Sequence, residues 1–134
     1  MAVRLFLGFH ALLWLPYGLY CAFVPSFLEG AASLAAAPST GTTEIRAMYG
    51  GLQAAIGVFA LLALVRPALR RPALLMLAFL CSGLASARLL GVGIDGAPSA
   101  YTLSALGFEI VSAGLAWWLL STSGVSGQPR RPHD

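Results

Sequence analysis

Four long apolar segments dominate this chain, and each has the length of a helix that crosses a lipid bilayer. The hydrocarbon core of a membrane requires about 20 consecutive, predominantly apolar residues in a helical span. The segments that meet this requirement are Leu5–Val24, Ala47–Val65, Ala73–Val92 and Ala100–Leu120. We therefore predict an all-α membrane protein, a four-transmembrane-helix bundle in residues 1–120.

The composition excludes the main soluble classes. Of the 134 residues, 58% are hydrophobic and only 10% are charged, whereas a soluble globular domain carries about 25% charged residues. The chain therefore has too few charges to cover a soluble enzyme, a secreted disulfide-rich domain or a disordered protein. Its Arg residues lie at the edges of apolar segments rather than in one patch, which argues against binding to nucleic acid.

The connecting segments are short, apart from the first. Phe27–Ala37 has a weakly amphipathic pattern that allows a short helix on the membrane surface. Thr42 or Thr43 is positioned to cap the second span, with Glu44 near its positive dipole end. After the fourth span, we predict a disordered polar tail over residues 121–134.

The distribution of Arg residues predicts the orientation. With four spans, both termini share one side with the basic turn Arg66–Pro72, and that side holds six of the eight Arg residues. The other two, Arg46 and Arg88, lie on or near the opposite side. Because positive charge favours the cytoplasmic side, we predict cytoplasmic N- and C-termini.

Each span carries polar or small residues along one helical face, which is typical of surfaces that contact other helices in a membrane. We also assign a packing role to Gly51 and Gly83, since Gly51 lies one turn from both Ala47 and Ala55. The four faces are His10, Trp14, Tyr17 and Cys21; Arg46, Gly50, Gln53 and Gly57; Cys81, Ala85 and Arg88; and Ala105, Glu109, Ser112 and Ala116.

Arg88 and Glu109 are the charges that packing explains least, because both fall within predicted spans. Helical side chains lean toward the N-terminus of their own helix, so in antiparallel spans these two converge. An unpaired charge at this depth costs roughly 3 kcal/mol, which favours an ion pair. Tyr17 and Gln53 lie at a similar level and could bind the carboxylate. The candidate ligand or polar-pocket residues are Arg88, Glu109, Arg46, Glu44, Gln53, Tyr17, Tyr49 and Asp95.

Metal and enzymatic chemistry find little support in the sequence. The only histidines, His10 and His133, are too few for a haem or a di-metal centre. No nucleophile–base pair stands out. We therefore expect no metal site and no cofactor. Whether the protein is an enzyme stays open, and the sequence argues more against an enzyme than for one.

The run Glu44-Ile45-Arg46-Ala47-Met48-Tyr49-Gly50-Gly51 is the most distinctive motif in the chain. Together with the later Arg88, the Asp95-Gly96 turn and Glu109, it resembles the family known as domain of unknown function 4345. The resemblance covers Leu5–Leu120. It implies a small four-helix protein of the bacterial inner (plasma) membrane, distantly similar to DoxX-like proteins, and through them a role associated with quinones or redox chemistry.

Three functions remain open at this point. The first is an intramembrane polar pocket, formed around Arg88 and Glu109, for an amphipathic small molecule such as a lipid or a quinone. The second is a structural or accessory subunit, with a homo-oligomer or a membrane protein as partner, in which these charges only hold helices together. The third is a small proton-coupled transporter that uses Glu109.

Overall fold

The computed structural model describes residues 1–35, 39–96 and 98–123, and over these residues it contains helices and no strand. Four helices are long and apolar enough to cross a membrane, which confirms the predicted fold class of an integral membrane protein. The elements are α1 (Ala2–Phe23), α2 (Phe27–Ala32), α3 (Thr40–Ile45), the π-helical segment η1 (Arg46–Gly51), α4 (Leu52–Val65), the 3₁₀ turn η2 (Pro67–Leu69), α5 (Arg70–Asp95) and α6 (Ala100–Ser123).

The second span starts earlier than the sequence analysis expects. It runs without interruption from Thr40 through α3, η1 and α4 to Val65. The prediction that Thr42 or Thr43 caps this span is wrong, since both lie inside α3. The Thr43 hydroxyl donates to the carbonyl of Ser39, 3.1 Å away, a bond that lets Thr sit within a helix. Glu44 is consequently beyond the first turn, and helix capping does not explain it.

The segment Phe27–Ala37, whose pattern allows a short helix, contains one, α2. It covers Phe27–Ala32 and ends at Ser33, whose backbone is left-handed with φ of 55°. Leu28 is buried in a small apolar cluster with Cys21 of α1 and Ile45 of α3, and this contact holds α2 against the spans. Residues 36 and 37, the last of that segment, lie outside the described residues. The tail predicted over residues 121–134 is wrong for its first three residues, which belong to α6, and its remainder from residue 124 onward lies outside the described residues.

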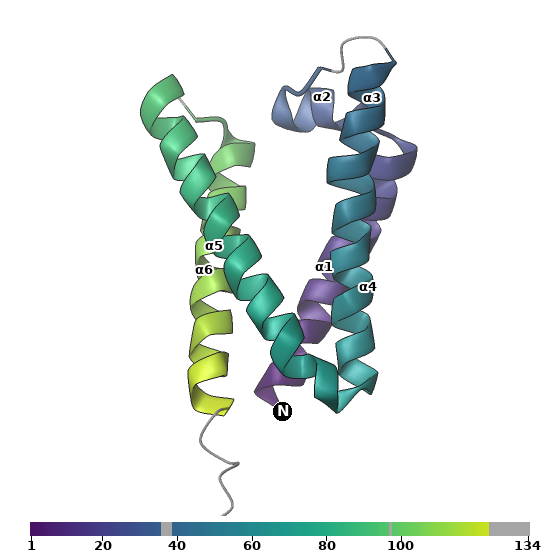
Figure 1. Ribbon diagram of the computed structural model, residues 1–134. Helices are drawn as coiled ribbons and strands as arrows, with labels where there is room; N and C mark the ends of the chain where they lie inside the picture. The colour runs from purple at the N-terminus through teal and green to yellow at the C-terminus, as the bar shows by residue number, and fades with distance from the viewer. Residues whose placement is uncertain (36–38, 97, 124–134) are drawn as a thin grey trace, which may run out of the picture.

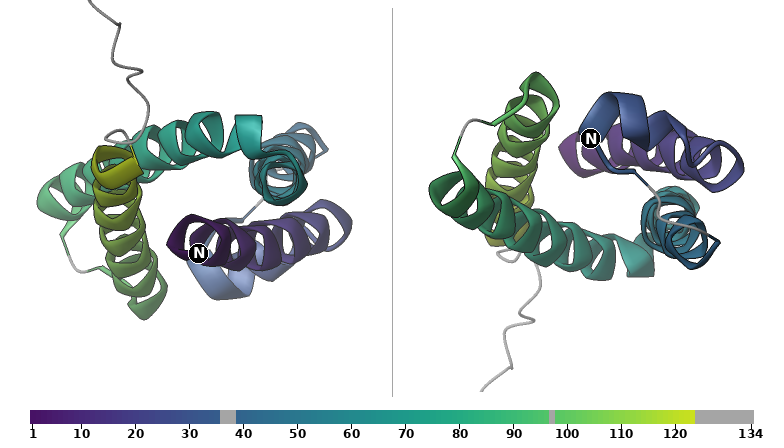
Figure 2. Two further views of the ribbon diagram at one scale, coloured as in Figure 1. Left: turned by 90° about the horizontal axis from the view of Figure 1, so that it is seen from below. Right: turned by 90° about the horizontal axis from the view of Figure 1, so that it is seen from above.

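The four spans form two antiparallel pairs, α1 with the α3–η1–α4 helix and α5 with α6 (Figures 1 and 2). The pairs meet at the end of the molecule that holds the N-terminus and η2, and they diverge toward the end that holds α2 and α3 (Figure 1). Small residues such as Ala63, Ala73 and Ala78 are buried in the main core and allow close approach. We attribute the divergence to the bulkier aromatic side chains that stand between the pairs farther along the helices.

Three glycines allow α1 and the second span to touch backbone to backbone. A Cβ added at Gly57 would lie 2.4 Å from the Leu15 nitrogen, and one at Gly50 would lie 2.7 Å from the Ala22 Cα. A Cβ at Gly18 would lie 2.3 Å from the Ala54 nitrogen. The packing roles predicted for Gly50 and Gly57 are therefore confirmed.

The packing roles predicted for Gly51 and Gly83 are wrong. Nothing lies within 4 Å of a Cβ added at Gly83, and at Gly51 the nearest atom is 3.8 Å away, on the preceding turn of the same helix. Successive helical residues point about 100° apart. Only one of the adjacent glycines can therefore face α1, and that one is Gly50.

Replacement of Gly57 by Ala is expected to destabilise the protein by roughly 1–3 kcal/mol, the usual cost of overpacking. The new methyl group would meet the α1 backbone, which cannot move aside as a side chain can. Thermal unfolding in detergent measures the effect. Gly83→Ala is the matched control, and it should be neutral or slightly stabilising because Ala favours helix more than Gly does. Equal melting temperatures for the two variants would contradict the close approach.

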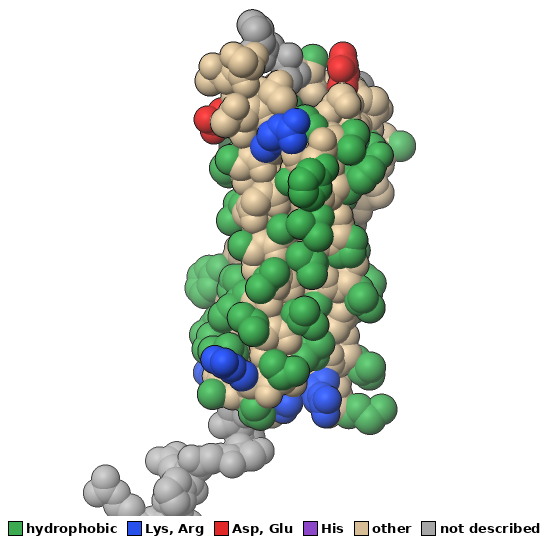
Figure 3. Space-filling view, turned by 90° about the vertical axis from the view of Figure 1, so that its right-hand side faces the viewer, with side chains coloured by type: hydrophobic (Ala, Val, Ile, Leu, Met, Phe, Trp, Pro, Cys, Tyr) green, Lys and Arg blue, Asp and Glu red, His purple; other side chains and the backbone are tan. Residues whose placement is uncertain are grey.

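Charged side chains gather at the two ends of the molecule, as expected for a protein that spans a bilayer. On the face drawn in Figure 3, Arg side chains lie at the lower end, and acidic side chains lie at the upper end together with a further basic side chain. Between them, apolar side chains cover most of the surface (Figure 3). This apolar belt separates the two charged ends by the length of the spans.

Candidate functional site

Arg88 of α5 and Glu109 of α6 form an ion pair, as the sequence analysis predicts. The Arg88 Nε donates to both carboxylate oxygens of Glu109, at 2.8 Å to Oε1 and 3.0 Å to Oε2. Glu109 is only 3% exposed, whereas the Arg88 side chain is 25% exposed. Glu109 lies nine residues beyond the start of α6, about 14 Å along the helix axis. The pair thus sits inside the apolar belt.

Local sequence features bring these two side chains together. The chain reverses direction between the end of α5 at Asp95 and the start of α6 at Ala100. The Ser99 hydroxyl accepts a hydrogen bond from the Thr102 backbone nitrogen, 3.1 Å away, which is the geometry of an N-terminal helix cap. This cap fixes where α6 begins and therefore which of its residues lies opposite Arg88.

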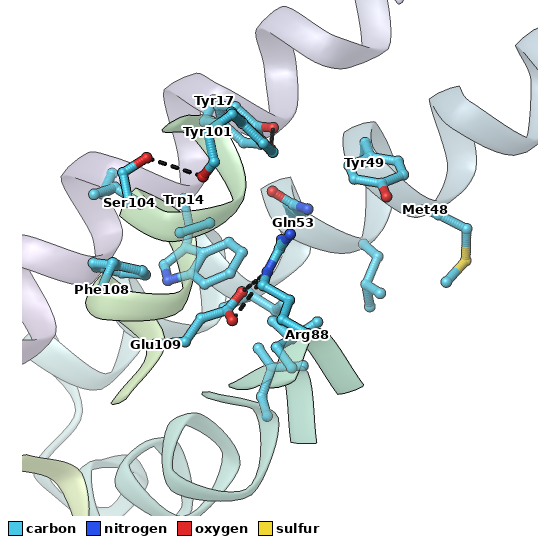
Figure 4. Close-up of a pocket in the computed structure, with 16 residues that line it drawn as sticks. Trp14, Tyr17, Met48, Tyr49, Gln53, Arg88, Tyr101, Ser104, Phe108 and Glu109 are labelled. Carbon is cyan, nitrogen blue, oxygen red and sulfur yellow. Dashed lines mark hydrogen bonds and ion pairs between the residues drawn. The ribbon is translucent and has the colours of Figure 1, made fainter. Parts of the chain in front are cut away.

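A cavity of about 580 Å³ lies beside the ion pair, with walls from all four spans (Figure 4). Its volume falls in the range of small-molecule sites, roughly 300–1,000 Å³. The polar lining residues are Tyr17, Tyr49, Gln53, Arg88, Tyr101, Ser104 and Glu109. The apolar lining residues are Leu13, Trp14, Met48, Leu52, Ile56, Leu80, Leu84, Ala105 and Phe108.

Two tyrosines bridge the helix pairs across this cavity. The hydroxyl groups of Tyr17 on α1 and Tyr101 on α6 are 2.9 Å apart and form a hydrogen bond. The Arg88 guanidinium carbon lies 5.9 Å from the centre of the Tyr101 ring, within cation–π distance. Tyr17 therefore does not bind the Glu109 carboxylate, as the sequence analysis suggested it could, but contacts Tyr101 instead.

Tyr101 is the site residue that the sequence analysis missed. Its place one residue into α6 favours an interfacial aromatic position, and nothing in the sequence sets the rotation of α6 relative to α1. Its spacing from Glu109 is the one feature of the sequence that could have placed Tyr101 at the site. The two are eight residues apart, close to the two-turn repeat that places residues on one helical face.

Gln53 brings an amide group from α4 into the same cavity. Its Oε1 is buried and has no hydrogen-bond partner among the residues that the structure describes. A buried acceptor without a partner costs about 1–3 kcal/mol. This oxygen is therefore available to a hydrogen-bond donor that enters the cavity.

Three predicted candidates, Arg46, Glu44 and Asp95, do not line the cavity. Arg46 instead donates a hydrogen bond from Nη1 to the carbonyl of Ala22, in the last turn of α1. The last four carbonyls of a helix lack partners within it, and a cationic side chain is favourable at that end. Arg46 therefore caps α1 rather than contributing to the pocket.

The distinctive motif thus serves mainly to fix α1 against the second span. Arg46 binds the Ala22 carbonyl, and Gly50 packs on the Ala22 backbone. The same residues form the π-helical segment η1, a feature that is often found at functional sites. Met48 and Tyr49 of this segment line the cavity, so η1 links the α1 contact to the candidate site.

The remaining polar residues of the spans stay apart from this cavity. His10 is buried against aromatic rings, and its Nδ1 lies 3.0 Å from the Phe6 carbonyl. Cys21 and Cys81 are free and buried, as expected of small apolar side chains. Within residues 1–35, 39–96 and 98–123, no group of three or more His, Cys, Asp or Glu side chains could hold a metal ion.

Comparison with known proteins gives a family and no assigned activity. The family described as Domain of unknown function (DUF4345) matches residues 2–120, which is most of the chain and includes every residue that lines the cavity. No curated protein matches the chain, and no solved structure does.

Proposed function

We propose that this chain, which belongs to the DUF4345 family, binds an amphipathic small molecule such as a lipid or a quinone in the cavity beside Arg88 and Glu109. The observation that carries the proposal is a buried ion pair in contact with a cavity of about 580 Å³ whose other walls are apolar. A polar head could contact the ion pair, and an apolar chain could contact the Leu and Phe side chains of the lining. An amphipathic molecule such as a lipid or a quinone has both a polar head and an apolar chain.

The exposure of the lining supports entry from the lipid. Met48 and Leu52 line the cavity, yet they are 55% and 45% exposed, so the cavity communicates with the outside of the bundle beside the second span. These two residues belong to the apolar belt, where the surrounding medium is lipid. A membrane-dissolved molecule could therefore reach the ion pair without crossing water.

Fluorescence of Trp14 tests the proposal directly, because this side chain lines the cavity and is only 5% exposed. The variant Trp117→Phe/Trp118→Phe leaves Trp14 as the one tryptophan of the chain. Bromine atoms quench tryptophan on contact. We expect saturable quenching when the methyl ester of a brominated octadecanoic acid is added to the purified protein in detergent.

The matched control is Trp14→Phe, which keeps Trp117 and Trp118. Both are exposed on α6, and we expect them to be quenched in proportion to probe concentration, without saturation. Non-saturable quenching of Trp14 by every brominated amphiphile tested would contradict a binding cavity.

An accessory or structural role is the second candidate, and one observation favours it. The Arg88–Glu109 pair and the Tyr17–Tyr101 hydrogen bond already connect three of the four spans without any ligand. In that role, a side chain from a helix of a partner protein, or of a second copy of this chain, would occupy the cavity. Saturable Trp14 quenching by a small amphiphile argues for the first candidate.

For the cellular setting, we propose the bacterial inner membrane with both termini in the cytoplasm. The support is the Arg distribution, six residues on the side of the termini against two elsewhere. The cavity would then face the outer half of the bilayer.

A reporter enzyme that is active only outside the cytoplasm is expected to stay silent when fused after Asp134. The same reporter inserted after Ala35, in the segment between α2 and α3, should be active because that segment lies at the opposite end of the spans. The reverse pair of activities would overturn the proposed orientation.

A further inference from the structure

We infer that the head group recognised in this cavity is an uncharged oxygen acceptor, such as the carbonyl of an ester or a ketone. This inference rests on the proposed binding function and specifies its ligand. It follows from two properties of the lining, the hydrogen-bonding groups left free and the balance of charge.

The first property is an excess of free donors at Arg88. Its Nε is occupied by both oxygens of Glu109, whereas Nη1 and Nη2 make no hydrogen bond with any residue that the structure describes. Those two nitrogens carry four N–H groups. Figure 4 shows this end of the guanidinium pointing away from Glu109 and toward Gln53. A ligand oxygen placed there would accept one or two of these hydrogen bonds.

The tyrosine pair adds a donor to the same lining. In the bond between Tyr17 and Tyr101, one hydroxyl donates and the other accepts. The accepting hydroxyl keeps its own hydrogen for another partner. Ser104 is not an equivalent donor, because its hydroxyl already donates to the Tyr101 backbone carbonyl at 2.9 Å. The free N–H and O–H groups near the ion pair outnumber the unpartnered acceptor of the lining, Gln53 Oε1, and therefore favour a ligand that accepts hydrogen bonds.

The second property is charge balance. Among the residues that the structure describes, Arg88 and Glu109 are the only charged ones that line the cavity, and their charges, +1 and −1, sum to zero. An anionic head would give the site a net charge of −1 at a depth where uncompensated charge is costly. A cationic head would face the free N–H groups of Arg88. An uncharged carbonyl neither adds net charge to the site nor is repelled by the N–H groups of Arg88.

Four probes with the same brominated octadecyl chain test this inference on the variant that retains only Trp14. They are the fatty-acid methyl ester, an alkyl sulfonate, an alkyl trimethylammonium and the bare hydrocarbon. A hydrogen bond to a charged group is worth about 1.5–3 kcal/mol, so the ester should bind at least about tenfold more tightly than the hydrocarbon. We expect the ester also to exceed the sulfonate and the ammonium.

Two results would overturn the inference while leaving the proposed function intact. One is sulfonate binding equal to or tighter than that of the ester. The other is an ester that binds no more tightly than the hydrocarbon, with both saturable. Absence of saturable quenching by all four probes would instead overturn the proposed function itself, and this inference with it.

Arg88→Lys provides the matched protein variant. Lysine keeps the positive charge opposite Glu109 but lacks the two terminal nitrogens of the guanidinium. We expect the preference for ester over hydrocarbon to fall by about tenfold, while hydrocarbon binding stays the same. An unchanged preference in a folded Arg88→Lys protein would overturn the role of the guanidinium. The probe series on the unaltered Arg88 protein is decisive even if this variant does not fold.

A competition then separates the two sources of such a carbonyl. Native mass spectrometry of the ester-loaded protein, with diacylglycerol or an alkyl benzoquinone added, shows which of them displaces the ester at the lower concentration. Displacement by diacylglycerol supports a lipid ester, and displacement by the benzoquinone supports a ring ketone. Retention of the ester against both overturns the assignment of the carbonyl to either of these sources.

Discussion

Replacing Glu109 by Gln is expected to destabilise the protein by roughly 3–5 kcal/mol, the usual cost of breaking a buried ion pair. Glu109 is 3% exposed, and its carboxylate holds the Arg88 Nε at 2.8 Å. Removal of its charge leaves the Arg88 guanidinium without a counter-ion inside the apolar belt. Arg88→Met should have an effect of similar size, because it leaves the carboxylate unpaired. Unfolding in mixed micelles measures both.

The double variant Arg88→Met/Glu109→Leu should recover much of this lost stability, since replacement of a buried pair by apolar residues is often neutral. This recovery tests whether the pair interacts, and the variant also separates the candidate functions. A folded double variant that has lost ligand binding supports the pocket, whereas one that retains the cellular role of the protein supports the accessory function. Additive losses of stability from the two single variants would contradict the ion pair.

The ion pair could be predicted from the sequence because few quantities determine it. Each residue lies within an apolar span, so its depth follows from its distance to the nearest turn and the helical rise of 1.5 Å. The direction of lean follows from the antiparallel order of the spans. Because an isolated charge inside the membrane is costly, the two residues are expected to pair. None of these arguments depends on how the helices rotate about their axes.

The rest of the site depends on that rotation, and the sequence does not specify it. Gly50 and Gly51 are both small and adjacent in the motif, yet only Gly50 faces α1. The sequence offers Arg46 as a pocket candidate beside Arg88, but in the structure Arg46 donates to the Ala22 carbonyl at the end of α1. The π-helical segment also shifts the register of the second span, and no residue pattern predicts it.

The cavity itself follows from packing volumes, which are a property of the whole bundle. At one end of the molecule, Ala63, Ala73 and Ala78 allow the helix pairs to meet. Farther along, Tyr17 and Tyr101 bridge the pairs with their rings. Two bulky residues that touch at their tips keep the backbones apart while leaving space beside them. The sequence shows the bulky residues but not which of them touch.

Filling the cavity should abolish ligand binding without unfolding the protein. Ala105 of α6 lines the cavity, one turn before Glu109, and Ala105→Phe would place a phenyl ring in the space beside the ion pair. We expect the affinity of the protein for the brominated ester probe, measured by saturable quenching of Trp14, to fall by more than about tenfold. The contacts that the probe would lose to the phenyl ring are worth more than about 1.4 kcal/mol. The melting temperature should stay the same or rise, since cavity-filling substitutions commonly stabilise by about 0.5–2 kcal/mol.

Leu103→Phe is the control for this experiment. It introduces the same side chain on α6, two residues away, but Leu103 is 53% exposed and does not line the cavity. Its binding curve should match that of the protein without either substitution. Normal ester binding by Ala105→Phe would mean that the ligand does not occupy this cavity. A large fall in melting temperature would mean that the space beside Glu109 is too small for a phenyl ring, and therefore too small for the chain of an amphiphile.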